Sequence, residues 1–267
     1  MINTYVPYLG IDEKKFVLNC INSNFISSAG PDVKKFEDKF CKKYKFKFAI
    51  ALNSGTSALH LALKLYNIGI NDLVIIPSYT FAATANAVKY TGAEPYFFDC
   101  DKNLLLDIKY LEKFFFSNTK NTLIQKHKKK IKAIMPVLTM GQEINFRKYE
   151  KFAKEKNLKV IFDAAACHNP KIIQKKGLSN SIYCFSFNGN KTLTTGAGGI
   201  LATNSKSLAN KARILSNVGK VKGNYDYQDI GYNYKMTNIQ ANLGLSQLKN
   251  LNKILKKKKI IFNYYEK

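Results

Sequence analysis

The sequence predicts an α/β fold with a mostly parallel, seven-stranded sheet and helices on both of its faces. Seven short apolar runs recur along the 267 residues, and each is suited to a buried strand. Segments with apolar residues at helical spacing separate most of these runs, which is typical of parallel strands joined by crossover helices. The hydrophobic fraction of 46% is large enough to build a substantial core.

The chain is expected to begin with two helices, Asp12 to Asn22 and Pro31 to Tyr44, because each places apolar residues along one face. Proline suits the first turn of the second helix, where its missing N–H leaves no helical bond unmade. The expected strands are 48–52, 73–76, 94–98, 133–138, 159–162, 182–187 and 199–203. The expected later helices are 57–66, 81–90, 146–156 and 205–216, and a long helix starts near Asn238. The lysine-rich stretch 117–132 is expected to be a loop or a short exposed helix.

The strongest compositional signal is a formal charge of +25, from 43 Lys and Arg against 18 Asp and Glu. Such an excess is typical of nucleic-acid binders. However, the lysines are spread along most of the chain, and the two dense runs, 126–130 and 256–259, have no recognition motif beside them. We therefore expect a solvated lysine surface and no nucleic-acid partner, with a positive field that favours an anionic, nucleotide-linked substrate.

Other features of the composition indicate the compartment and exclude some kinds of site. No apolar run is long enough to cross a bilayer, and the first residues lack the charged-then-apolar pattern of a signal peptide. A cytoplasmic protein without a membrane partner is therefore expected. The five cysteines and three histidines form no close pairs at metal-ligand spacing, so we expect reduced thiols and no metal site.

Two segments that follow expected strands carry groups suited to binding charge. The run Asn53-Ser54-Gly55-Thr56-Ser57 joins a strand to a helix, and the free N–H groups of a helix start make a phosphate site together with hydroxyl groups. Taken alone, this run is better explained as an ordinary N-cap with a glycine turn. Asp163 ends an apolar strand before small residues, so its carboxylate faces a cleft and needs a partner. A helix-capping role explains Asp163 equally well.

The other two segments lie later in the chain. The third, 185–191, ends in Lys191 after a strand and a polar turn. A surface lysine is the simpler explanation, but the run 192–199 contains three glycines, which indicates tight backbone beside a close neighbour. The fourth, Gly231 to Asn238, is an aromatic and polar turn before the last helix, and on its own it is a loop with an N-cap.

Together, a phosphate cradle, a strand-end acid and a lysine are the parts that pyridoxal 5′-phosphate (PLP) needs. The cradle anchors the phosphate, and the acid pairs with the pyridine nitrogen and keeps it protonated. The lysine forms the internal Schiff base and then moves protons. The sequence therefore indicates a PLP site.

These segments resemble the DegT/DnrJ/EryC1/StrS family of PLP-dependent sugar aminotransferases, which have the fold-type-I, aspartate-aminotransferase-like architecture. Residues 53–60 look like its phosphate-binding turn, and residues 77–86 look like the next segment, where an aromatic side chain stacks on the ring. Residues 186–191 match its Ser-Phe and Asn-Lys signature, and residues 231–236 match its late signature. The motifs occur in the family's order, and jointly they are highly specific.

The resemblance implies a role for seven residues. Lys191 and Asp163 would be catalytic, as the Schiff-base lysine and as the partner of the pyridine nitrogen. Phe81 would stack on the ring. Asn233 would reach the phosphate of the neighbouring subunit's cofactor, which implies a homodimer with shared sites. The phosphate ligands within the subunit would be Gly55, Thr56 and Ser186.

The chain also departs from the family pattern. Ala166, Leu138, Ala197 and Lys235 stand where a polar residue, a His, a Glu and an Arg are common. Family chains continue through a small C-terminal domain that helps to close the site, so a fragment or a truncated gene is expected. Residues 1–236 are then the large PLP-binding domain, and residues 237–267 are a helix leading toward a small domain that is largely absent.

The resemblance implies an enzyme that moves an amino group from glutamate to a nucleotide-linked keto-deoxy sugar at C4. The most similar branch makes amino sugars of the legionaminic-acid type for surface polysaccharides. Within the family, a sugar dehydratase has His in place of the lysine, and Lys191 argues against it. Two alternatives belong to other classes: a truncated remnant that folds or dimerises without turnover, and a nucleic-acid-binding module that only the charge supports.

Overall fold

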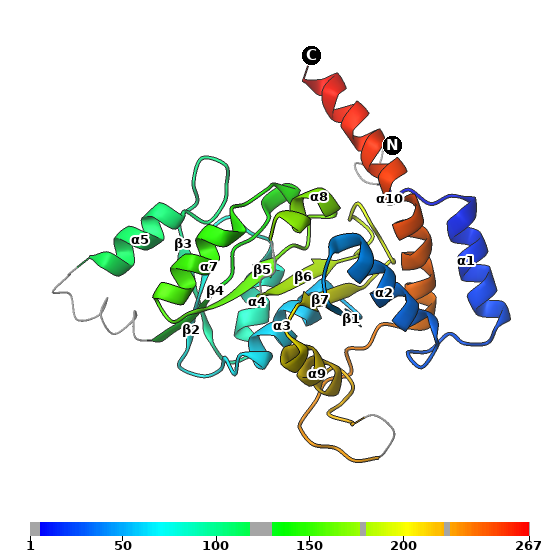
Figure 1. Ribbon diagram of the computed structural model, residues 1–267, viewed down its shortest axis with the longest axis horizontal. Coiled ribbons are helices and arrows are strands. Elements are labelled where there is room, and N and C mark those ends of the chain that lie inside the picture. Colours follow the sequence, from blue (N-terminus) through cyan, green and yellow to red (C-terminus); the bar gives the residue numbers. More distant parts are fainter. Residues whose placement is uncertain (1–5, 118–129, 177–179, 222–224, 267) are drawn as a thin grey trace.

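The computed structural model describes residues 6–117, 130–176, 180–221 and 225–266. Within these ranges a single twisted sheet lies between helices, and the long helix α10 stands at one end of it (Figure 1). This arrangement confirms the predicted α/β fold with a mostly parallel seven-stranded sheet. Most of the lysine-rich stretch 117–132, including the run 126–129, lies outside the described residues.

Strand order determines where side chains can converge. The order across the sheet is β1-β7-β6-β5-β4-β2-β3. Only β7 among these strands runs antiparallel to its neighbours, so the other six end at the same edge. The strands are β1 (Phe48–Leu52), β2 (Leu73–Pro77), β3 (Glu94–Phe98), β4 (Ile131–Ile134), β5 (Lys159–Asp163), β6 (Ile182–Ser186) and β7 (Gly199–Thr203).

The helices follow the expected order, with two additions. They are α1 (Ile11–Asn22), α2 (Asp32–Tyr44), α3 (Gly55–Leu65), α4 (Ala82–Lys89), α5 (Ile108–Phe116), α7 (Phe146–Glu155), α8 (Pro170–Ile173), α9 (Lys206–Leu215) and α10 (Asn238–Tyr265). Two 3₁₀ turns cover Thr139–Gly141 and Gln174–Lys176. Neither α5 nor α8 was expected, although Asp107 and Asn169 cap them with side chains that accept from backbone N–H groups.

Several boundaries differ from the prediction for local reasons. Helix α3 begins at Gly55 instead of residue 57, because the Ser54 side chain accepts from the Ser57 N–H and so acts as the N-cap. Strand β4 ends at Ile134, and the chain beyond it keeps one isolated bridge to β5, from Val137 to Asp163. Pro31 lies at the N-cap of α2 instead of its first turn.

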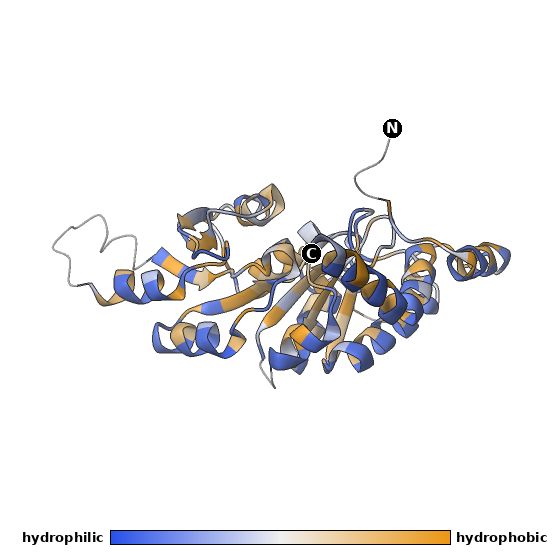
Figure 2. Cartoon of the chain, turned by 90° about the horizontal axis from the view of Figure 1, so that it is seen from above, coloured by the Kyte–Doolittle hydropathy of each residue, from blue (hydrophilic) through white to orange (hydrophobic). Residues whose placement is uncertain are grey.

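Alternation along the buried strands creates two apolar layers, one on each face of the sheet. In β6, Tyr183 and Phe185 pack in the layer that contains α2 and α7 residues, whereas Ile182 and Cys184 pack in the layer that contains α3 residues. This is the period of two expected for a strand covered on both faces. Figure 2 shows apolar strands between helices whose outer residues are hydrophilic.

Helix α10 is part of the same core over its first half. Leu245, Leu248 and Leu251 are buried with Phe36 of α2. Gly244 permits this approach, since a Cβ there would lie 2.6 Å from the Phe36 ring. On the other side, the buried carboxylate of Glu13 in α1 accepts from Ser246 Oγ at 2.9 Å. The N-terminal helix is thereby tied to the last one.

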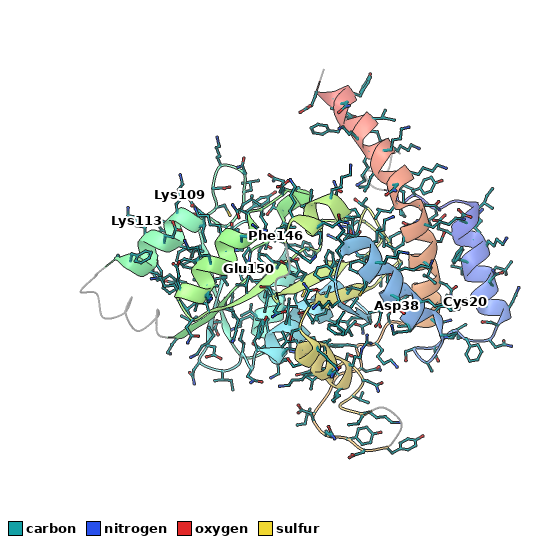
Figure 3. The ribbon with its side chains drawn as sticks, viewed as in Figure 1. Cys20, Asp38, Lys109, Lys113, Phe146 and Glu150 are labelled. Atoms are coloured by element: carbon teal, nitrogen blue, oxygen red, sulfur yellow. The ribbon has the colours of Figure 1, made fainter. Side chains whose placement is uncertain are left out.

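The surface carries most of the lysines that were expected to be solvated. Lys109 and Lys113 lie one turn apart on the exposed side of α5 (Figure 3). Lys176 is different: it is buried, and its amine donates to the carbonyl of Lys45 at 2.9 Å and lies over the Phe46 ring. Among the described helices, none has the length and apolarity needed to cross a bilayer.

One ion pair joins elements on both faces at the β1 edge. The buried carboxylate of Glu37 in α2 accepts from Arg213 of α9 at 2.8 Å and from the backbone N–H of Ala51 in β1 at 2.9 Å. Arg213 also donates to the carbonyl of Ala49 at 3.0 Å. Burial raises the pKa of Glu37, and Arg213 opposes that rise. Removing Arg213 therefore leaves a buried charge without its cation.

We expect Arg213→Ala to lower the free energy of unfolding at pH 7 by about 2 kcal/mol, because Glu37 stays buried without its partner. The loss of stability should be smaller at pH 5. The pKa of Glu37 in the folded variant lies above its unfolded value, so lowering the pH protonates the buried carboxylate and removes the uncompensated charge. Urea unfolding at both pH values measures this. The matched control is Arg147→Ala, which changes an exposed arginine. Equal losses for the two variants would contradict the role of the pair.

Candidate active site

A cavity of about 650 Å³ opens at the carboxyl ends of the parallel strands, where ligands bind in sheets of this kind. Its size is typical of small-molecule sites. Segments that follow β1, β2, β4, β5 and β6 line it. Six of the residues that were predicted from the sequence lie in its wall, namely Gly55, Thr56, Phe81, Asp163, Ser186 and Lys191.

Asn233 is the predicted residue that does not line this cavity. Its side chain is exposed, its carbonyl accepts from the side chain of Asn53 at 3.2 Å, and it forms a bridge to Asn217. The next residue, Tyr234, accepts from the backbone N–H of Asn53 at 2.8 Å. The late segment therefore braces the turn that begins the phosphate cradle, while Asn233 is exposed and does not line the cavity of its own chain.

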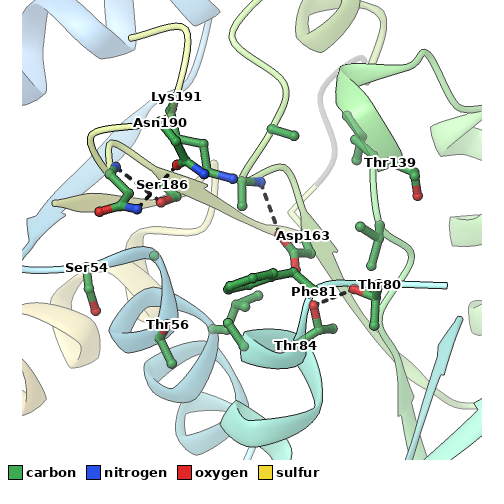
Figure 4. Close-up of a pocket in the computed structure, with 18 of the residues that line it drawn as sticks. Ser54, Thr56, Thr80, Phe81, Thr84, Thr139, Asp163, Ser186, Asn190 and Lys191 are labelled. Atoms are coloured by element: carbon green, nitrogen blue, oxygen red, sulfur yellow. Dashed lines mark hydrogen bonds between the residues drawn. The ribbon is translucent and has the colours of Figure 1, made fainter. Parts of the chain in front are cut away.

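The start of α3 supplies the candidate phosphate cradle. Ser54 caps the helix with a 3.0 Å bond from the Ser57 N–H, and Ser57 Oγ donates to Asn53 Oδ1 at 2.7 Å. Gly55 and Thr56 occupy the first turn, whose N–H groups have no acceptor within a helix. With the Thr56 hydroxyl beside them in the cavity wall, these groups can hold a phosphate (Figure 4).

Two glycines allow close packing at this cradle, where the start of α3 meets the end of β6 and the start of β7. A Cβ on Gly55 would lie 2.6 Å from the Cβ of Ser186, and a Cβ on Gly199 would lie 2.4 Å from the carbonyl oxygen of Ser54. The close neighbour that the glycine-rich run predicted is therefore the cradle itself. Ser186 is brought beside Gly55 because β6 and β1 run in the same direction on either side of β7.

Asp163 is buried at the end of β5, with 4% of its surface exposed. Its Oδ1 accepts from the Ala165 N–H at 3.0 Å, and its Oδ2 accepts from the Thr84 hydroxyl at 2.8 Å. Burial raises the pKa of this carboxyl group, whereas the two hydrogen bonds and the charge of Lys191 lower it. Such a carboxylate is stabilised by any cation that enters the cavity.

Lys191 approaches the same carboxylate from the turn after β6. The Lys191 N–H bonds the carbonyl of Asn188 at 2.9 Å, which closes the turn, and the Phe187 N–H bonds the carbonyl of Gly198 at 2.8 Å. Figure 4 shows the Lys191 side chain extending from this turn into the cavity toward Asp163. The amine and the acid thus share one cavity although 27 intervening residues separate them.

Phe81 lies at the N-cap of α4 with 79% of its surface exposed, and its ring lies at the cavity beside Asp163 (Figure 4). An aromatic ring this exposed presents a free face to a flat ligand. One helical turn later, Thr84 is almost fully buried and reaches Asp163. The sequence interpretation assigned no role to Thr84, although its spacing of three from Phe81 places both on one face of α4.

Much of the remaining cavity wall is apolar. Leu138, Ala166 and Ala197, which depart from the family pattern, all line the cavity, and so does the exposed side chain of Met140. Met140 was not predicted, and its backbone has a positive φ of 53°. The fourth departure, Lys235, bridges to Leu52 instead of lining the cavity.

His168 lies buried behind the cavity and was not predicted either. Burial and the charge of Lys191 lower its pKa to about 3, so the ring is neutral near pH 7. Its ring packs against Phe187 with centroids 5.8 Å apart. His168 is therefore a neutral neighbour of Lys191, and the charge of Lys258 acts on the same ring.

The residues present fit PLP. The helix start with Thr56 and Ser186 suits a phosphate dianion, and the exposed Phe81 ring suits an aromatic face. The buried Asp163 carboxylate suits a protonated ring nitrogen, because it is held by only two donors in a cavity that penalises its charge. Lys191 adds an amine in the same space.

Comparison with known proteins agrees with this assignment. The sequence pattern of the DegT/DnrJ/EryC1/StrS aminotransferase family matches residues 7–267. The GDP-perosamine synthase of Escherichia coli O157:H7 is 38% identical over 268 residues, which cover 100% of this chain and 71% of that protein. A UDP-4-amino-4,6-dideoxy-N-acetyl-beta-L-altrosamine transaminase of Campylobacter jejuni is 34% identical and covers 91% of this chain and 63% of its own length.

A solved structure gives the same result for the fold. The PLP-form of Spr1654 from Streptococcus pneumoniae superposes with a TM-score of 0.84 at 25% identity, over 99% of this chain and 70% of that one. The family recognised from the sequence motifs, the PLP-transferase fold and the cofactor are thereby confirmed.

We expect Gly55→Ala to weaken PLP binding by at least about tenfold, because the added Cβ collides with Ser186 and displaces the cradle. Fluorescence or absorbance titration with PLP measures the dissociation constant. Gly69→Ala is the matched control, since its Cβ would meet only the carbonyl oxygen of Thr91 at an ordinary 3.6 Å. Unchanged PLP affinity in Gly55→Ala would show that the phosphate lies elsewhere.

Proposed function

Since the chain belongs to the DegT/DnrJ/EryC1/StrS aminotransferase family, we propose that it transfers an amino group from glutamate to C4 of a nucleotide-linked keto-deoxy sugar. The observation that carries the proposal is the shared cavity of Asp163 and Lys191 beside Gly55 and Thr56. An acid, an amine and a phosphate cradle within one cavity are the minimum that PLP-dependent transamination requires.

The cradle and the aromatic side chain would bind and orient the cofactor. Gly55, Thr56 and Ser186 would hold the phosphate through N–H and hydroxyl donors at the start of α3. Phe81 would cover one face of the ring from the start of α4. Because these groups lie on the ends of packed elements, the ring would be held in one orientation relative to Asp163.

Asp163 would hold a proton on the ring nitrogen. When bound, PLP supplies an electron sink for the charge left as a proton leaves the carbon that bears the transferred nitrogen. That sink depends on a protonated ring, and a buried carboxylate favours the protonated form. The largely apolar cavity wall strengthens this pairing by excluding water.

Lys191 would hold the cofactor covalently at rest and then act as the general acid and base. Its Nζ would remove a proton from the donor carbon and return it on the far side of the transferred nitrogen, as a 1,3-shift requires. With the keto-sugar as acceptor, the same amine would work in the opposite direction.

The substrate assignment rests on the relatives' names and on charge. The Campylobacter jejuni relative is named for a 4-amino-4,6-dideoxy sugar on UDP, and the Escherichia coli relative is named for a GDP-sugar. Both names support a nucleotide-linked amino sugar, and the Campylobacter jejuni name supports nitrogen at C4. A Bacillus subtilis relative named as a spore coat polysaccharide biosynthesis protein supports a role in surface polysaccharides. The net charge of +25 favours such an anionic substrate.

The proposal includes a cytoplasmic homodimer with shared sites. Asn233 is exposed and does not line the cavity of its own chain, so it is free to contact the cofactor phosphate of a second subunit. We also keep residues 1–236 as the PLP-binding domain and residues 237–267 as the helix that follows it.

We expect Lys191→Ala to abolish transamination and to remove the visible absorbance band that the wild type forms with PLP. Asp163→Asn should retain part of the PLP binding and lose turnover by about 10²-fold or more, because the ring nitrogen loses its charged partner. Absorbance spectra with PLP, before and after addition of glutamate, measure both effects. Lys109→Ala, which removes an exposed lysine of α5, is the control.

The same spectra separate the alternatives. A band that disappears on addition of glutamate, followed by its return with a GDP- or UDP-linked 4-keto-6-deoxy sugar, supports the enzyme. A band that glutamate leaves unchanged indicates a remnant that binds cofactor without turnover. Full activity in Lys191→Ala would refute the assignment.

A further inference from the structure

The hydroxyl groups of two threonines form a chain that ends on the buried acid. Thr84 Oγ1 lies 2.8 Å from Asp163 Oδ2, and Thr80 Oγ1 lies 2.7 Å from Thr84 Oγ1 (Figure 4). A carboxylate can only accept, so the Thr84 hydroxyl must donate to it. The proton between the two threonines must then come from Thr80. The chain is therefore directional, from Thr80 through Thr84 to Asp163.

The environment of this chain changes along its length. Asp163 and Thr84 are 4% and 1% exposed, whereas Thr80 is half-buried and lines the cavity. Each hydroxyl that accepts one bond and donates the next is polarised, so the bond on Asp163 is stronger than an isolated one. The cavity wall is thereby connected to the buried carboxylate through two side chains.

The backbone of Asp163 leaves its carboxylate little freedom to move. Its N–H donates to the carbonyl of Pro136 at 2.9 Å, and its own carbonyl accepts from the N–H of Leu138 at 2.9 Å. On the other side, the N–H of Ala164 donates to the carbonyl of Cys184 at 2.8 Å. With the main chain fixed by both neighbouring strands, the contacts of Oδ1 and Oδ2 determine where the carboxylate points.

Those two oxygens have different supports. Oδ1 is held by the Ala165 N–H, which no side-chain substitution removes, and Oδ2 is held by Thr84. Thr84 also lies on the first turn of α4, where its N–H bonds the carbonyl of Phe81 at 3.0 Å. One helical turn therefore carries both the aromatic ring at the cavity and the hydroxyl that orients the acid.

We propose that Thr84 is a positioning residue, which fixes and keeps ionised the Asp163 carboxylate and couples it to the placement of Phe81, with Thr80 as the supporting donor. The inference rests on the proposed function for its link to the cofactor. The chain of hydroxyls itself belongs to the protein and acts on Asp163 whether or not a cofactor is bound.

The first test measures Asp163 without cofactor. The ¹³C shift of its carboxyl carbon, identified by its loss in Asp163→Asn, is followed against pH in the wild type, Thr84→Val and Thr84→Ser. Thr84→Val removes the donor at nearly constant shape, so the pKa of Asp163 should rise. Thr84→Ser keeps the hydroxyl and should titrate like the wild type. Identical titrations of the wild type and Thr84→Val would overturn the proposal.

The second test measures PLP binding. Thr84→Val should raise the dissociation constant by about tenfold to a hundredfold, since a hydrogen bond to a charged group is lost. As the pH is lowered, the PLP affinity of Thr84→Val should begin to fall at a higher pH than that of the wild type. The reason is that Asp163 becomes protonated at a higher pH in the variant. Thr80→Val should show a smaller effect of the same sign, and Thr84→Ser should restore binding. Impaired binding in Thr84→Ser equal to that in Thr84→Val would contradict a role for the hydroxyl.

Thr91→Val is the matched control, because Thr91 follows the same helix, is buried, and donates to the carbonyl of Val88 at 2.7 Å. Thr91→Val should lower thermal stability without shifting the Asp163 titration or the pH dependence of PLP binding. A shift in Thr91→Val as large as that in Thr84→Val would overturn the proposal.

The two tests also separate this proposal from the proposed function. If the wild type binds no PLP, the proposed function fails, and the carboxyl titration still decides whether Thr84 positions Asp163.

Discussion

The site depends on one buried negative charge, the carboxylate of Asp163. A carboxylate removed from water is destabilised unless donors or a cation compensate for it. Here a backbone N–H and one threonine hydroxyl provide two hydrogen bonds, and the amine of Lys191 lies in the same cavity. The arrangement therefore favours a ligand that brings a positive charge to the end of β5. A protonated pyridine ring is such a ligand, and the positions of the phosphate cradle and of Phe81 are consistent with it.

The topology of the sheet explains why these groups meet. Because β1, β5 and β6 run in the same direction, the turns that follow them converge at one edge, although their residues are distant along the chain. The antiparallel β7 lies between β1 and β6, and its Gly199 makes room for Ser54, while Gly55 lets the start of α3 approach Ser186. Helix α4 completes the wall, since its first turn carries both Phe81 and Thr84. Packing on both faces then holds these turns in place.

Sequence patterns predicted the seven strands and their mostly parallel arrangement, because buried strands are apolar runs and their ends carry turn residues. The six predicted residues in the cavity wall came from the resemblance to the family motifs. Helix α5 was not predicted, although Asp107 before it is a recognisable N-cap. The bond from Thr84 to Asp163 joins residues 79 positions apart, and no local pattern reports such a contact. The role predicted for the exposed Asn233 is contact with the cofactor of a second subunit, so the fold of one subunit does not test it.

The central claim is that Lys191, among the many lysines of this chain, is the one whose amine binds the cofactor beside Asp163. The most direct measurement is to mix the protein with PLP, reduce the mixture with borohydride, digest it and locate the added cofactor mass by mass spectrometry. The account predicts one modified peptide, with the added mass on Lys191, and a smaller amount of it in Asp163→Asn when PLP is limiting. Modification scattered over surface lysines, or concentrated on a lysine outside the cavity, would contradict it.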